Sequence, residues 1–229
     1  MVTERDADVG IRTRPFPIIL SAPSGAGKTT VANEIFKRLP YIRFAVSLTT
    51  RPRRDGEVEE SDYRFVSVEE FERSRDSGEL AEWARVHGNL YGTPRVEIDD
   101  ALAEGNHVLL DVDVQGGASL MQAYPEGVSI FLLPPSHAAM EARLKGRGTD
   151  SHEEIEARLE EAIRELERVE EYQYVIVNRE LDKTVETFAR IIHAEETRRV
   201  RRENLEEWLD SHFPERAAQK ATIEEGGTA

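Results

Sequence analysis

Short apolar runs alternate with amphipathic stretches from the start of the chain. Residues 16–21 form a run rich in branched side chains between a proline and the loop 22–25, which predicts a buried strand that enters a tight loop. Residues 29–39 then repeat apolar side chains at helical spacing and stop before Pro40, which predicts a helix. A strand, a glycine-bearing loop and a helix in this order predict the opening of a βαβ unit.

The same rhythm returns in the second half of the chain. Nearly continuous apolar runs predict strands that are buried on both faces of a sheet, at residues 108–114, 129–133 and 174–177. Stretches with helical spacing lie between and after these runs, at residues 95–104, 137–144, 151 to about 172 and 181 to about 202. The pattern therefore predicts an α/β fold with a mostly parallel sheet.

Residues 41–97 follow a different pattern. Two short strand-like pieces, residues 44–47 and 63–66, lie on either side of a polar, arginine-rich loop. Ser67 and Glu70 have the spacing of a capping box, which predicts a short helix after Ser67. We expect this stretch to form a small mixed insertion in the larger α/β sheet.

Both ends of the chain are polar. Residues 1–14 have no apolar core, so they do not have the pattern of a signal peptide, and we expect a disordered leader. The composition also turns polar after Pro214, which predicts a frayed tail. Because no apolar run is long enough to span a bilayer, we expect a soluble, cytoplasmic protein with no membrane partner.

The charge balance narrows the range of ligands. The 229 residues include 30 Lys and Arg and 45 Asp and Glu, which gives a formal net charge of −15 at pH 7. A chain this acidic repels nucleic acid and anionic lipid as a whole, so a phosphate ligand requires a local cluster of cations. The absence of cysteine excludes thiol catalysis and cysteine-ligated zinc, and the 6 histidines lack the paired spacing of a metal site.

The loop after the first predicted strand has the composition of a phosphate-binding loop. Residues 22–29 read Ala-Pro-Ser-Gly-Ala-Gly-Lys-Thr and fit the pattern G-x4-G-K-[ST] with alanine in the first place. Gly25 and Gly27 permit a backbone whose N–H groups point inward around phosphates. Lys28 would reach the β and γ phosphates, and the Thr29 hydroxyl is placed to ligate Mg²⁺. The flanking strand and helix disfavour the alternative of a chance match in an ordinary loop.

Three arginines within four residues form a local cationic cluster in this acidic chain. Arg51, Arg53 and Arg54 suggest a second phosphate site, because arginine binds phosphate with two parallel hydrogen bonds. Tyr63 and Tyr91 offer phenolic donors to the same group. A solvated loop whose arginines pair with nearby Asp and Glu explains the charge pattern equally well.

Carboxylates at the end of a predicted strand suggest a metal site. Asp111 and Asp113 end the strand 108–114, where alternation would place both on one face. Because ligands of open α/β sheets bind beyond the carboxyl ends of the strands, Asp113 is placed to hold Mg²⁺ through water. A hydrogen-bonded core aspartate is the alternative. By itself, Glu82 has the pattern of a surface carboxylate.

Taken together, the motifs closely resemble those of guanylate kinases over residues 17–195. The motifs are Ser-Ala-Pro-Ser-Gly-Ala-Gly-Lys-Thr at 21–29, Ser47-x-Thr-Thr-Arg51, Gly56-Glu57 with Asp62-Tyr63-x-Phe65, Glu82-Trp83 with Gly88-Asn89-x-Tyr91-Gly92, Asp111-x-Asp113-x-Gln115-Gly116, Gly146-Arg147-Gly148-Thr149 and Ile176-Val-Asn178. The resemblance implies a three-layer P-loop fold with a mostly parallel sheet, a small mixed α/β insertion and a helical lid. The implied divisions are a domain at 15–197 with its core at 15–43 and 94–197, a GMP-binding insertion at 44–93, a lid at 144–160 and a helical extension and tail at 198–229.

The family transfers the γ-phosphate of ATP to GMP, so the resemblance implies ATP with Mg²⁺ as donor and GMP or dGMP as acceptor. The implied ATP-binding residues are Ala22, Pro23, Ser24, Gly25, Ala26, Gly27, Lys28, Thr29, Thr30 and Asn178. The implied GMP-binding residues are Ser47, Arg51, Arg54, Tyr63, Glu82, Tyr91, Thr93 and Asp113. The implied catalytic residues are Lys28, Arg51, Asp113 and the lid arginines Arg147 and Arg158, with Thr29 and Asp113 toward the metal, the latter through water.

Two departures from the family pattern concern the acceptor site: Arg53 stands where proline is common, and Leu48 replaces a small polar residue. The arginine-rich run 198–202 is expected to form a solvated helix face that pairs with nearby Glu. A non-catalytic guanylate-kinase-like binding module is the alternative from another class, which Lys28, Thr29 and Arg158 disfavour. The patterns leave open whether the protein is a monomer or a homo-oligomer.

Overall fold

The computed structural model describes residues 10–54, 56–86, 88–146, 152–216 and 219–220. A five-stranded parallel sheet forms its centre, in the order β2-β7-β1-β8-β9. The strands are β1 (Pro17–Ser21), β2 (Ile42–Phe44), β7 (His107–Asp111), β8 (Val128–Leu133) and β9 (Tyr174–Val177). Every residue of the central strand β1 is buried, as its apolar run predicts.

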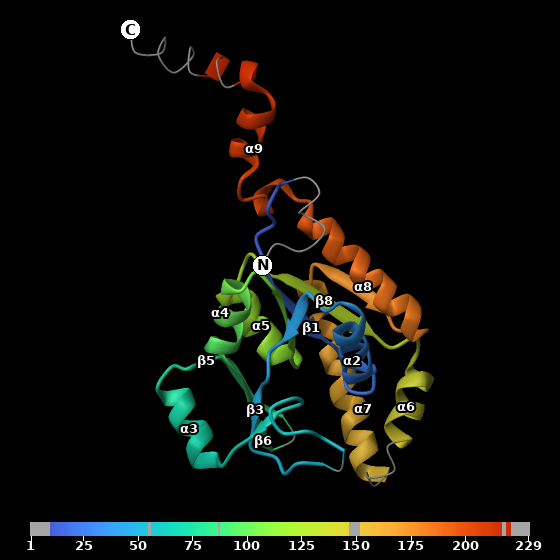
Figure 1. Cartoon of the computed structure of the whole chain (residues 1–229). Coiled ribbons are helices and arrows are strands. Elements are labelled where there is room, and N and C mark those ends of the chain that lie inside the picture. Colours follow the sequence, from blue (N-terminus) through green and yellow to red (C-terminus); the bar gives the residue numbers. More distant parts are fainter. Residues whose placement is uncertain (1–9, 55, 87, 147–151, 217–218, 221–229) are drawn as a thin grey trace.

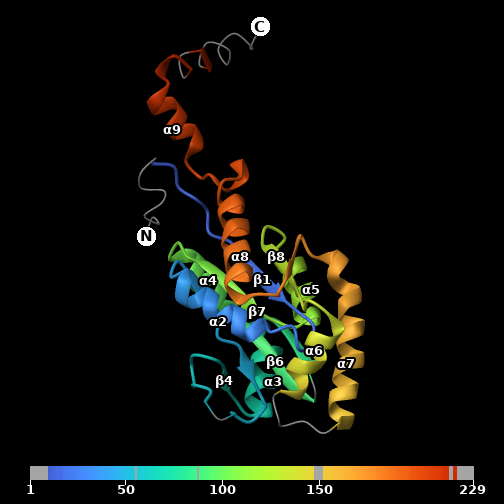
Figure 2. The same ribbon diagram turned by 90° about the vertical axis from the view of Figure 1, so that its right-hand side faces the viewer.

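Helices cover both faces of this sheet (Figures 1 and 2). On one face, α2 (Lys28–Arg38) and α8 (Leu181–Glu196) pack against each other and share a core with alternate side chains of β1. On the other face, α4 (Arg95–Ala103) and α5 (Val114–Ala123) pack against Ile19 of β1. The expected three-layer α/β fold is therefore confirmed, because successive side chains of a strand point to opposite faces.

A second, four-stranded sheet lies below the first in Figure 1, in the order β4-β3-β6-β5. Its strands are β3 (Leu48–Thr49), β4 (Arg64–Phe65), β5 (Leu80–Val86) and β6 (Asn89–Pro94). One strand pair is parallel and two are antiparallel. The helix α3 (Val68–Asp76) packs on the sheet, and Ser67 caps it by accepting a hydrogen bond from the Glu70 amide, as predicted.

The strands of this region differ from the predicted ones. Residues 44–47 do not form one strand, because β2 ends at Phe44 in the central sheet and β3 begins at Leu48 in the small sheet. The hairpin of β5 and β6 was not predicted. Its buried positions include the polar residues Glu82 and Thr93, so the chain shows no apolar alternation there.

Two helices lie next to each other at one side of the molecule (Figure 1). They are α6 (His137–Lys145) and α7 (His152–Leu166), which are in contact. The chain continues from α7 into the 3₁₀ helix η1 (Glu167–Glu171), so the helix predicted up to residue 172 tightens in its last turns.

The C-terminal helix is shorter than predicted. α8 ends at Glu196 rather than near residue 202, and a 3₁₀ helix, η2 (Arg199–Arg201), follows. The Arg201 side chain is only 6% exposed, donates to the Glu195 carboxylate at 2.9 Å and stacks on the Phe16 ring at 3.9 Å. The expected solvated arginine face is therefore wrong for Arg201, because the chain turns back to pair it with a buried anion.

The segment just before β1 is also ordered where a disordered leader was expected. Residues 10–14 run alongside residues 201–204, with backbone bonds from Arg14 N to Arg201 O at 2.7 Å and from Glu203 N to Arg12 O at 3.1 Å. The disorder prediction is wrong for residues 10–14, and residues 1–9 lie outside the described part. α9 (Leu205–His212) then projects away from the sheets (Figures 1 and 2).

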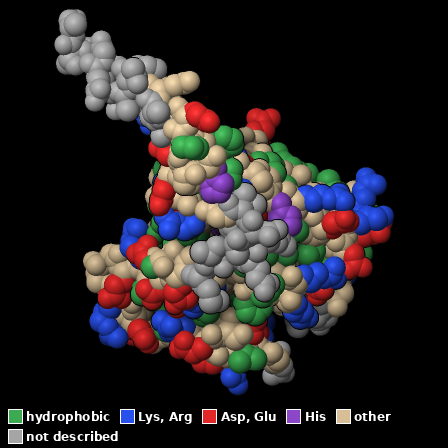
Figure 3. Space-filling view, turned by 45° about the horizontal axis from the view of Figure 1, so that its top comes forward, with side chains coloured by type: hydrophobic (Ala, Val, Ile, Leu, Met, Phe, Trp, Pro, Cys, Tyr) green, Lys and Arg blue, Asp and Glu red, His purple; other side chains and the backbone are tan. Residues whose placement is uncertain are grey.

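Acidic and basic side chains are interspersed over the face seen in Figure 3. Many of the surface arginines and lysines pair with neighbouring carboxylates, for example Arg190 with Glu186 and Lys145 with Glu141. Within the described residues, no helix combines the length and the apolar character that crossing a membrane would need.

Candidate active site

The loop between β1 and α2 has the backbone geometry that phosphate binding requires. Gly25 and Gly27 have φ angles of 82° and 89°, in the left-handed region that favours glycine. A Cβ atom on Gly27 would lie 2.8 Å from Asn178 Nδ2, so a larger residue would be both strained and crowded. α2 begins at Lys28 directly after this loop, which places the positive end of a helix beside it.

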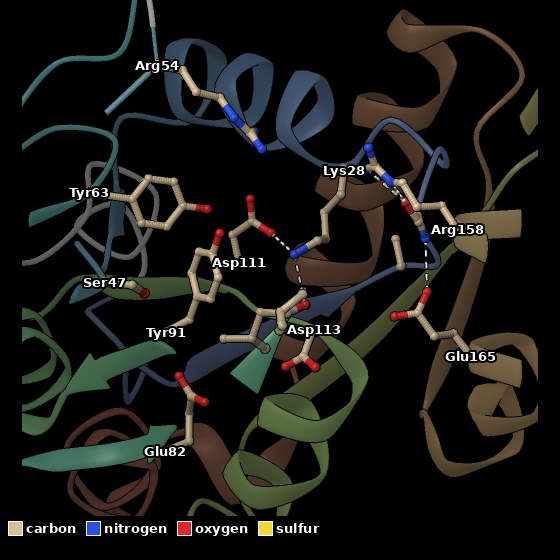
Figure 4. Close-up of a pocket in the computed structure, with 14 residues that line it drawn as sticks. Lys28, Ser47, Arg54, Tyr63, Glu82, Tyr91, Asp111, Asp113, Arg158 and Glu165 are labelled. Carbon is tan, nitrogen blue, oxygen red and sulfur yellow. Dashed lines mark hydrogen bonds and ion pairs between the residues drawn. The ribbon is translucent and has the colours of Figure 1, made fainter. Parts of the chain in front are cut away.

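A cavity opens where this loop meets the ends of the central strands and the small sheet (Figure 4). The sequence-predicted residues that line it are Ala22, Ser24, Lys28, Ser47, Arg54, Tyr63, Glu82, Tyr91, Asp113 and Arg158. These residues lie far apart in the sequence, and the tertiary structure brings them around one space.

Lys28 crosses the floor of this cavity. Its ammonium group forms an ion pair with the Asp111 carboxylate and donates to the Val112 carbonyl at 2.8 Å (Figure 4). Asp111 is the last residue of β7, which is next to β1 in the sheet. Lys28 therefore approaches the carboxyl ends of the strands, where open α/β sheets bind their ligands.

The second aspartate has a different position from the predicted one. The strand ends at Asp111, so Asp113 does not share a strand face with it. Instead Asp113 is the N-cap of α5, and its Oδ1 accepts a hydrogen bond from the Gly116 amide at 2.9 Å. Asp113 thus caps a helix, which is close to the alternative of a hydrogen-bonded core aspartate, and it also lines the cavity.

Glu82 lies on the inner side of β5 and is only 6% exposed, in contrast to the surface position that its local pattern indicates. Its Oε1 accepts a hydrogen bond from the Thr93 hydroxyl at 2.7 Å, and Thr93 is 3.2 Å from the Ser47 hydroxyl. Burial raises the pKa of the Glu82 carboxyl to about 7. A Cβ atom on Gly116 would lie 2.6 Å from Glu82 Oε2, so the first turn of α5 closes on this carboxylate.

The arginine cluster divides into two environments. Arg54 lines the cavity together with Tyr63 and Tyr91. Arg51 is 7% exposed and pairs with Glu57. The alternative of an arginine paired with a nearby carboxylate therefore holds for its partner, but Arg51 is buried rather than solvated. Among the described residues that line the cavity, Arg51 is absent. It does contact Tyr91, which lines the cavity.

α7 brings two charged side chains to the phosphate loop at Ser24. Arg158 Nη2 donates to the Ser24 hydroxyl at 3.2 Å, and Glu165 Oε2 accepts from the Ser24 amide at 3.0 Å. Burial raises the pKa of the Glu165 carboxyl to about 7. Glu165 is not among the residues predicted from the sequence, although it lies two helical turns after Arg158 on the same face. The predicted lid residue Arg147 lies outside the described residues.

A second pocket lies along the phosphate loop, lined in part by Gly25, Gly27, Thr30 and Asn178. Asn178 Nδ2 donates to the Ala26 carbonyl at 2.8 Å, which ties the end of β9 to the loop. Arg143, also missed by the sequence analysis, lines this pocket.

Arg143 spans the same junction as Asn178: it donates to the Ala26 carbonyl at 2.7 Å and to the Asn178 carbonyl at 3.0 Å. The loop residues are thereby shared between two pockets.

The remaining predicted residues take supporting positions. The Pro23 carbonyl accepts the Ala26 amide within the loop at 3.0 Å, and Thr29 is exposed in the first turn of α2. The cavity as a whole offers lysine and arginine donors for phosphates, phenolic and aliphatic hydroxyls, and the carboxylates of Glu82, Asp111, Asp113 and Glu165. The cationic side chains can bind two phosphate groups, and the Glu82 carboxylate can bind a ligand that carries hydrogen-bond donors.

Comparison with known proteins identifies the family. The family model of guanylate kinase matches residues 14–195. A guanylate kinase from Syntrophotalea carbinolica is 48% identical over 183 residues, which cover 80% of this chain and 87% of that protein. A guanylate kinase from Chelativorans sp. is 43% identical over 207 residues, which cover 90% of this chain and 95% of that protein.

A solved structure supports the same assignment. The crystal structure of guanylate kinase from Anaplasma phagocytophilum superposes with a TM-score of 0.74 at 38% sequence identity, covering 89% of this chain and 98% of that one. The phosphate loop, the buried carboxylate and the paired sheets thus lie in a chain that belongs to the guanylate kinase family.

Proposed function

We propose that the protein transfers the γ-phosphate of ATP to GMP, and also to dGMP, with ADP and the nucleoside diphosphate as products. The observation that carries the proposal is that one cavity is lined both by Lys28 of the phosphate loop and by the buried carboxylate Glu82. A lysine in this loop is suited to a nucleoside triphosphate, and a buried carboxylate is suited to a base that presents N–H donors. Membership of the guanylate kinase family supports the same activity.

The acceptor would bind at the small sheet, within residues 44–93. In this proposal the ionised Glu82 accepts hydrogen bonds from N1–H and the exocyclic amine of guanine, with Ser47 and Thr93 beside it. Adenine has neither donor at these positions, so the carboxylate would stay unpaired and AMP would be rejected. The phosphate of GMP would be bound by Arg54, Tyr63 and Tyr91 with Arg51 behind them, and Asp113 would complete the acceptor site. Because these contacts are to the base and the phosphate, dGMP is included as an acceptor.

The donor would bind along the phosphate loop. The backbone N–H groups of Gly25, Gly27 and Lys28 and the Lys28 ammonium would surround the phosphates of ATP, and Asn178 would lie toward the adenine. Arg158 contacts the loop at Ser24, and in this proposal its guanidinium would lie beside the terminal phosphate. We propose that residues 144–160, with Arg147 and Arg158, act as a lid that closes over both nucleotides.

The side chains proposed for Mg²⁺ fit that ion. Thr29 and Asp113 offer only hydroxyl and carboxylate oxygens, which are the ligands that Mg²⁺ prefers. Asp113 would act through water. Bound Mg²⁺ would offset the negative charge of the β and γ phosphates.

Phosphoryl transfer needs positioning and charge stabilisation rather than a covalent nucleophile. The attacking group is a phosphate oxygen of GMP, which needs no general base to become an anion. Lys28 and the lid arginines would stabilise the charge that spreads over the γ-phosphate oxygens, and lid closure would exclude water from that charge. Lys28, Arg51, Asp113, Arg147 and Arg158 are therefore the residues proposed to act in catalysis.

A non-catalytic binding module is not supported, because the phosphate loop retains both its left-handed glycines and its lysine. The test is a substrate screen in which ATP and Mg²⁺ are offered with GMP, dGMP, AMP, CMP or UMP, and ADP release is coupled to NADH oxidation. We expect turnover with GMP and dGMP and little with the other three. Absence of GMP-dependent ADP release, or equal rates with AMP, would contradict the proposal.

A further inference from the structure

Arg51 is one of the residues proposed for the acceptor phosphate, yet its guanidinium is already engaged within the protein. Nη1 and Nη2 donate to the two oxygens of the Glu57 carboxylate at 2.7 and 2.5 Å, and Nη1 also donates to the Pro52 carbonyl at 2.9 Å. Nε donates to the Tyr91 hydroxyl at 3.2 Å. Because a guanidinium has five N–H groups, these bonds leave at most one for a ligand.

The contacts of Arg51 fix the orientation of the phenols that line the cavity. Since the Tyr91 oxygen accepts the Arg51 N–H, the Tyr91 hydroxyl proton is free to be donated elsewhere, and Tyr91 lines the cavity. The guanidinium carbon lies 5.1 Å from the centre of the Tyr63 ring, and the two tyrosine rings are 5.9 Å apart, edge to face. Arg51 thus holds one phenol by a hydrogen bond and the other by its ring face.

Glu57 connects Arg51 and the two tyrosines to Arg54. Its Oε2 accepts a hydrogen bond from the Arg54 amide at 2.8 Å, in addition to the bond from Arg51. The Arg54 side chain lines the same cavity and lies above Tyr63 in Figure 4. A single carboxylate therefore determines where the loop places both arginines and, through Arg51, both tyrosines. The hydrogen bond from Arg51 also holds the pKa of Glu57 below its ordinary value, so the pair is ionised at neutral pH.

We propose that Glu57 is a positioning residue of the acceptor-phosphate site: it contacts no substrate, and it fixes both the Arg54 segment of the loop and the Arg51 guanidinium behind the two tyrosines, so that the Tyr91 hydroxyl proton is donated to the phosphate of the acceptor. The inference rests on the proposed function, since it assigns a role at the GMP phosphate. Without Glu57 the buried Arg51 guanidinium loses its fixed orientation, and its charge turns toward other partners. The phosphate then meets donors that must first be ordered, which costs affinity for GMP but leaves the guanine and ATP sites intact.

The test compares Glu57→Gln with a matched control, Glu60→Gln. Gln has nearly the same shape as Glu but cannot accept from both arms of the guanidinium. Glu60 stands in the same loop and forms a two-pronged pair with Arg64, at 3.1 Å for each bond, but Glu60 is exposed and neither residue lines the cavity. Three quantities are measured for each protein: KM for GMP, KM for ATP, and the inhibition constant of guanosine as a competitor of GMP. Thermal unfolding confirms that each variant is folded.

We expect Glu57→Gln to raise KM for GMP about tenfold or more, because it removes a charge-assisted pair that organises the phosphate donors. KM for ATP and the inhibition constant of guanosine, which has no phosphate, should stay within about twofold of wild type, as should all three constants of Glu60→Gln. In the background of Tyr91→Phe, which removes the donated proton, Glu57→Gln should raise KM for GMP by a smaller factor, because both changes break the same chain of contacts.

Three results would overturn the inference: an unchanged KM for GMP in Glu57→Gln, an equal loss for guanosine and GMP, or an effect that is fully multiplicative with Tyr91→Phe. The first would mean that the pair does not serve the phosphate, and the second that Glu57 supports the fold of the whole insertion. These results leave the wild-type activity untouched. Failure of the proposed function would instead appear as absent GMP phosphorylation in the wild-type protein.

Discussion

In the proposed function, the buried carboxylate Glu82 makes base recognition depend on pH. Burial raises the pKa of Glu82 to about 7, and only the ionised form can accept both N–H donors of guanine. We therefore expect kcat/KM for GMP, measured at saturating ATP, to rise with pH through the neutral range. Substitution Glu82→Gln keeps the shape of the side chain and removes the ionisation, so the variant should lose this part of the pH dependence.

The magnitude follows from the titration. With a pKa of about 7, about nine-tenths of the free protein is ionised at Glu82 at pH 8 and about one-tenth at pH 6. At pH 8 the variant loses two charge-assisted hydrogen bonds, which at roughly 1.5 kcal/mol or more each lowers kcat/KM by about a hundredfold or more. At pH 6 most of the wild-type protein already lacks the anion, so the ratio between wild type and variant should be about tenfold smaller than at pH 8.

The assay is a coupled measurement of ADP release at a series of pH values with both proteins. The GMP phosphate and Glu165 also titrate near this range, but they do so equally in wild type and variant. The ratio of the two kcat/KM values therefore isolates Glu82. A ratio that is the same at pH 6 and pH 8 would refute the assignment of Glu82 as an ionised reader of the base, and equal losses for ATP and GMP in the variant would refute its place in the acceptor site.

The raised pKa of Glu82 should also make the stability of the protein depend on pH. This effect runs opposite to that on kcat/KM, because the contribution of Glu82 to the free energy of unfolding falls as the pH rises. The pKa of Glu82 lies above its unfolded value of 4.5, so the folded state holds this proton more tightly. The associated stabilisation is complete below about pH 4.5 and is lost as the pH rises through about 7, a change of about 3 kcal/mol. Glu82→Gln should therefore raise the free energy of unfolding relative to wild type at pH 8 more than at pH 5, which urea titrations at the two pH values would measure. An equal difference at both pH values would contradict the raised pKa.

Further predictions concern the donor site and the C-terminal part. Lys28→Ala should reduce turnover to background in the coupled assay while calorimetry still detects GMP binding, and an unchanged kcat would contradict the role of the phosphate loop. Arg201→Ala should lower the free energy of unfolding in urea by about 3 kcal/mol or more, because it leaves the buried Glu195 without its buried partner. Arg198→Ala removes the exposed partner of the same carboxylate and should cost about 1 kcal/mol or less; equal losses in the two variants would contradict this distinction. Deletion of residues 205–229 should leave kcat within about twofold of wild type, since α9 has no buried residue; a collapse of kcat would show that the extension takes part in the reaction.

Features with a local physical cause could be predicted from the sequence. The run 16–21, the glycines of the phosphate loop and the apolar spacing of 29–39 each act within a few residues, so the first strand, loop and helix were predicted close to their observed bounds. The cap at Ser67 is equally local. The motifs of the phosphate loop and the acceptor region also identified the family, because their residue types and order reflect the chemistry of phosphate binding.

The features that only the tertiary structure decided depend on contacts between distant segments. Glu82 becomes a buried carboxylate because β6 and the first turn of α5 close on it. Arg51 faces Glu57 rather than the cavity, and α8 stops at Glu196 because Arg201 returns to a buried partner. Burial and ion pairing depend on what lies opposite a side chain in space, and the pattern of neighbouring residues along the chain does not contain that information.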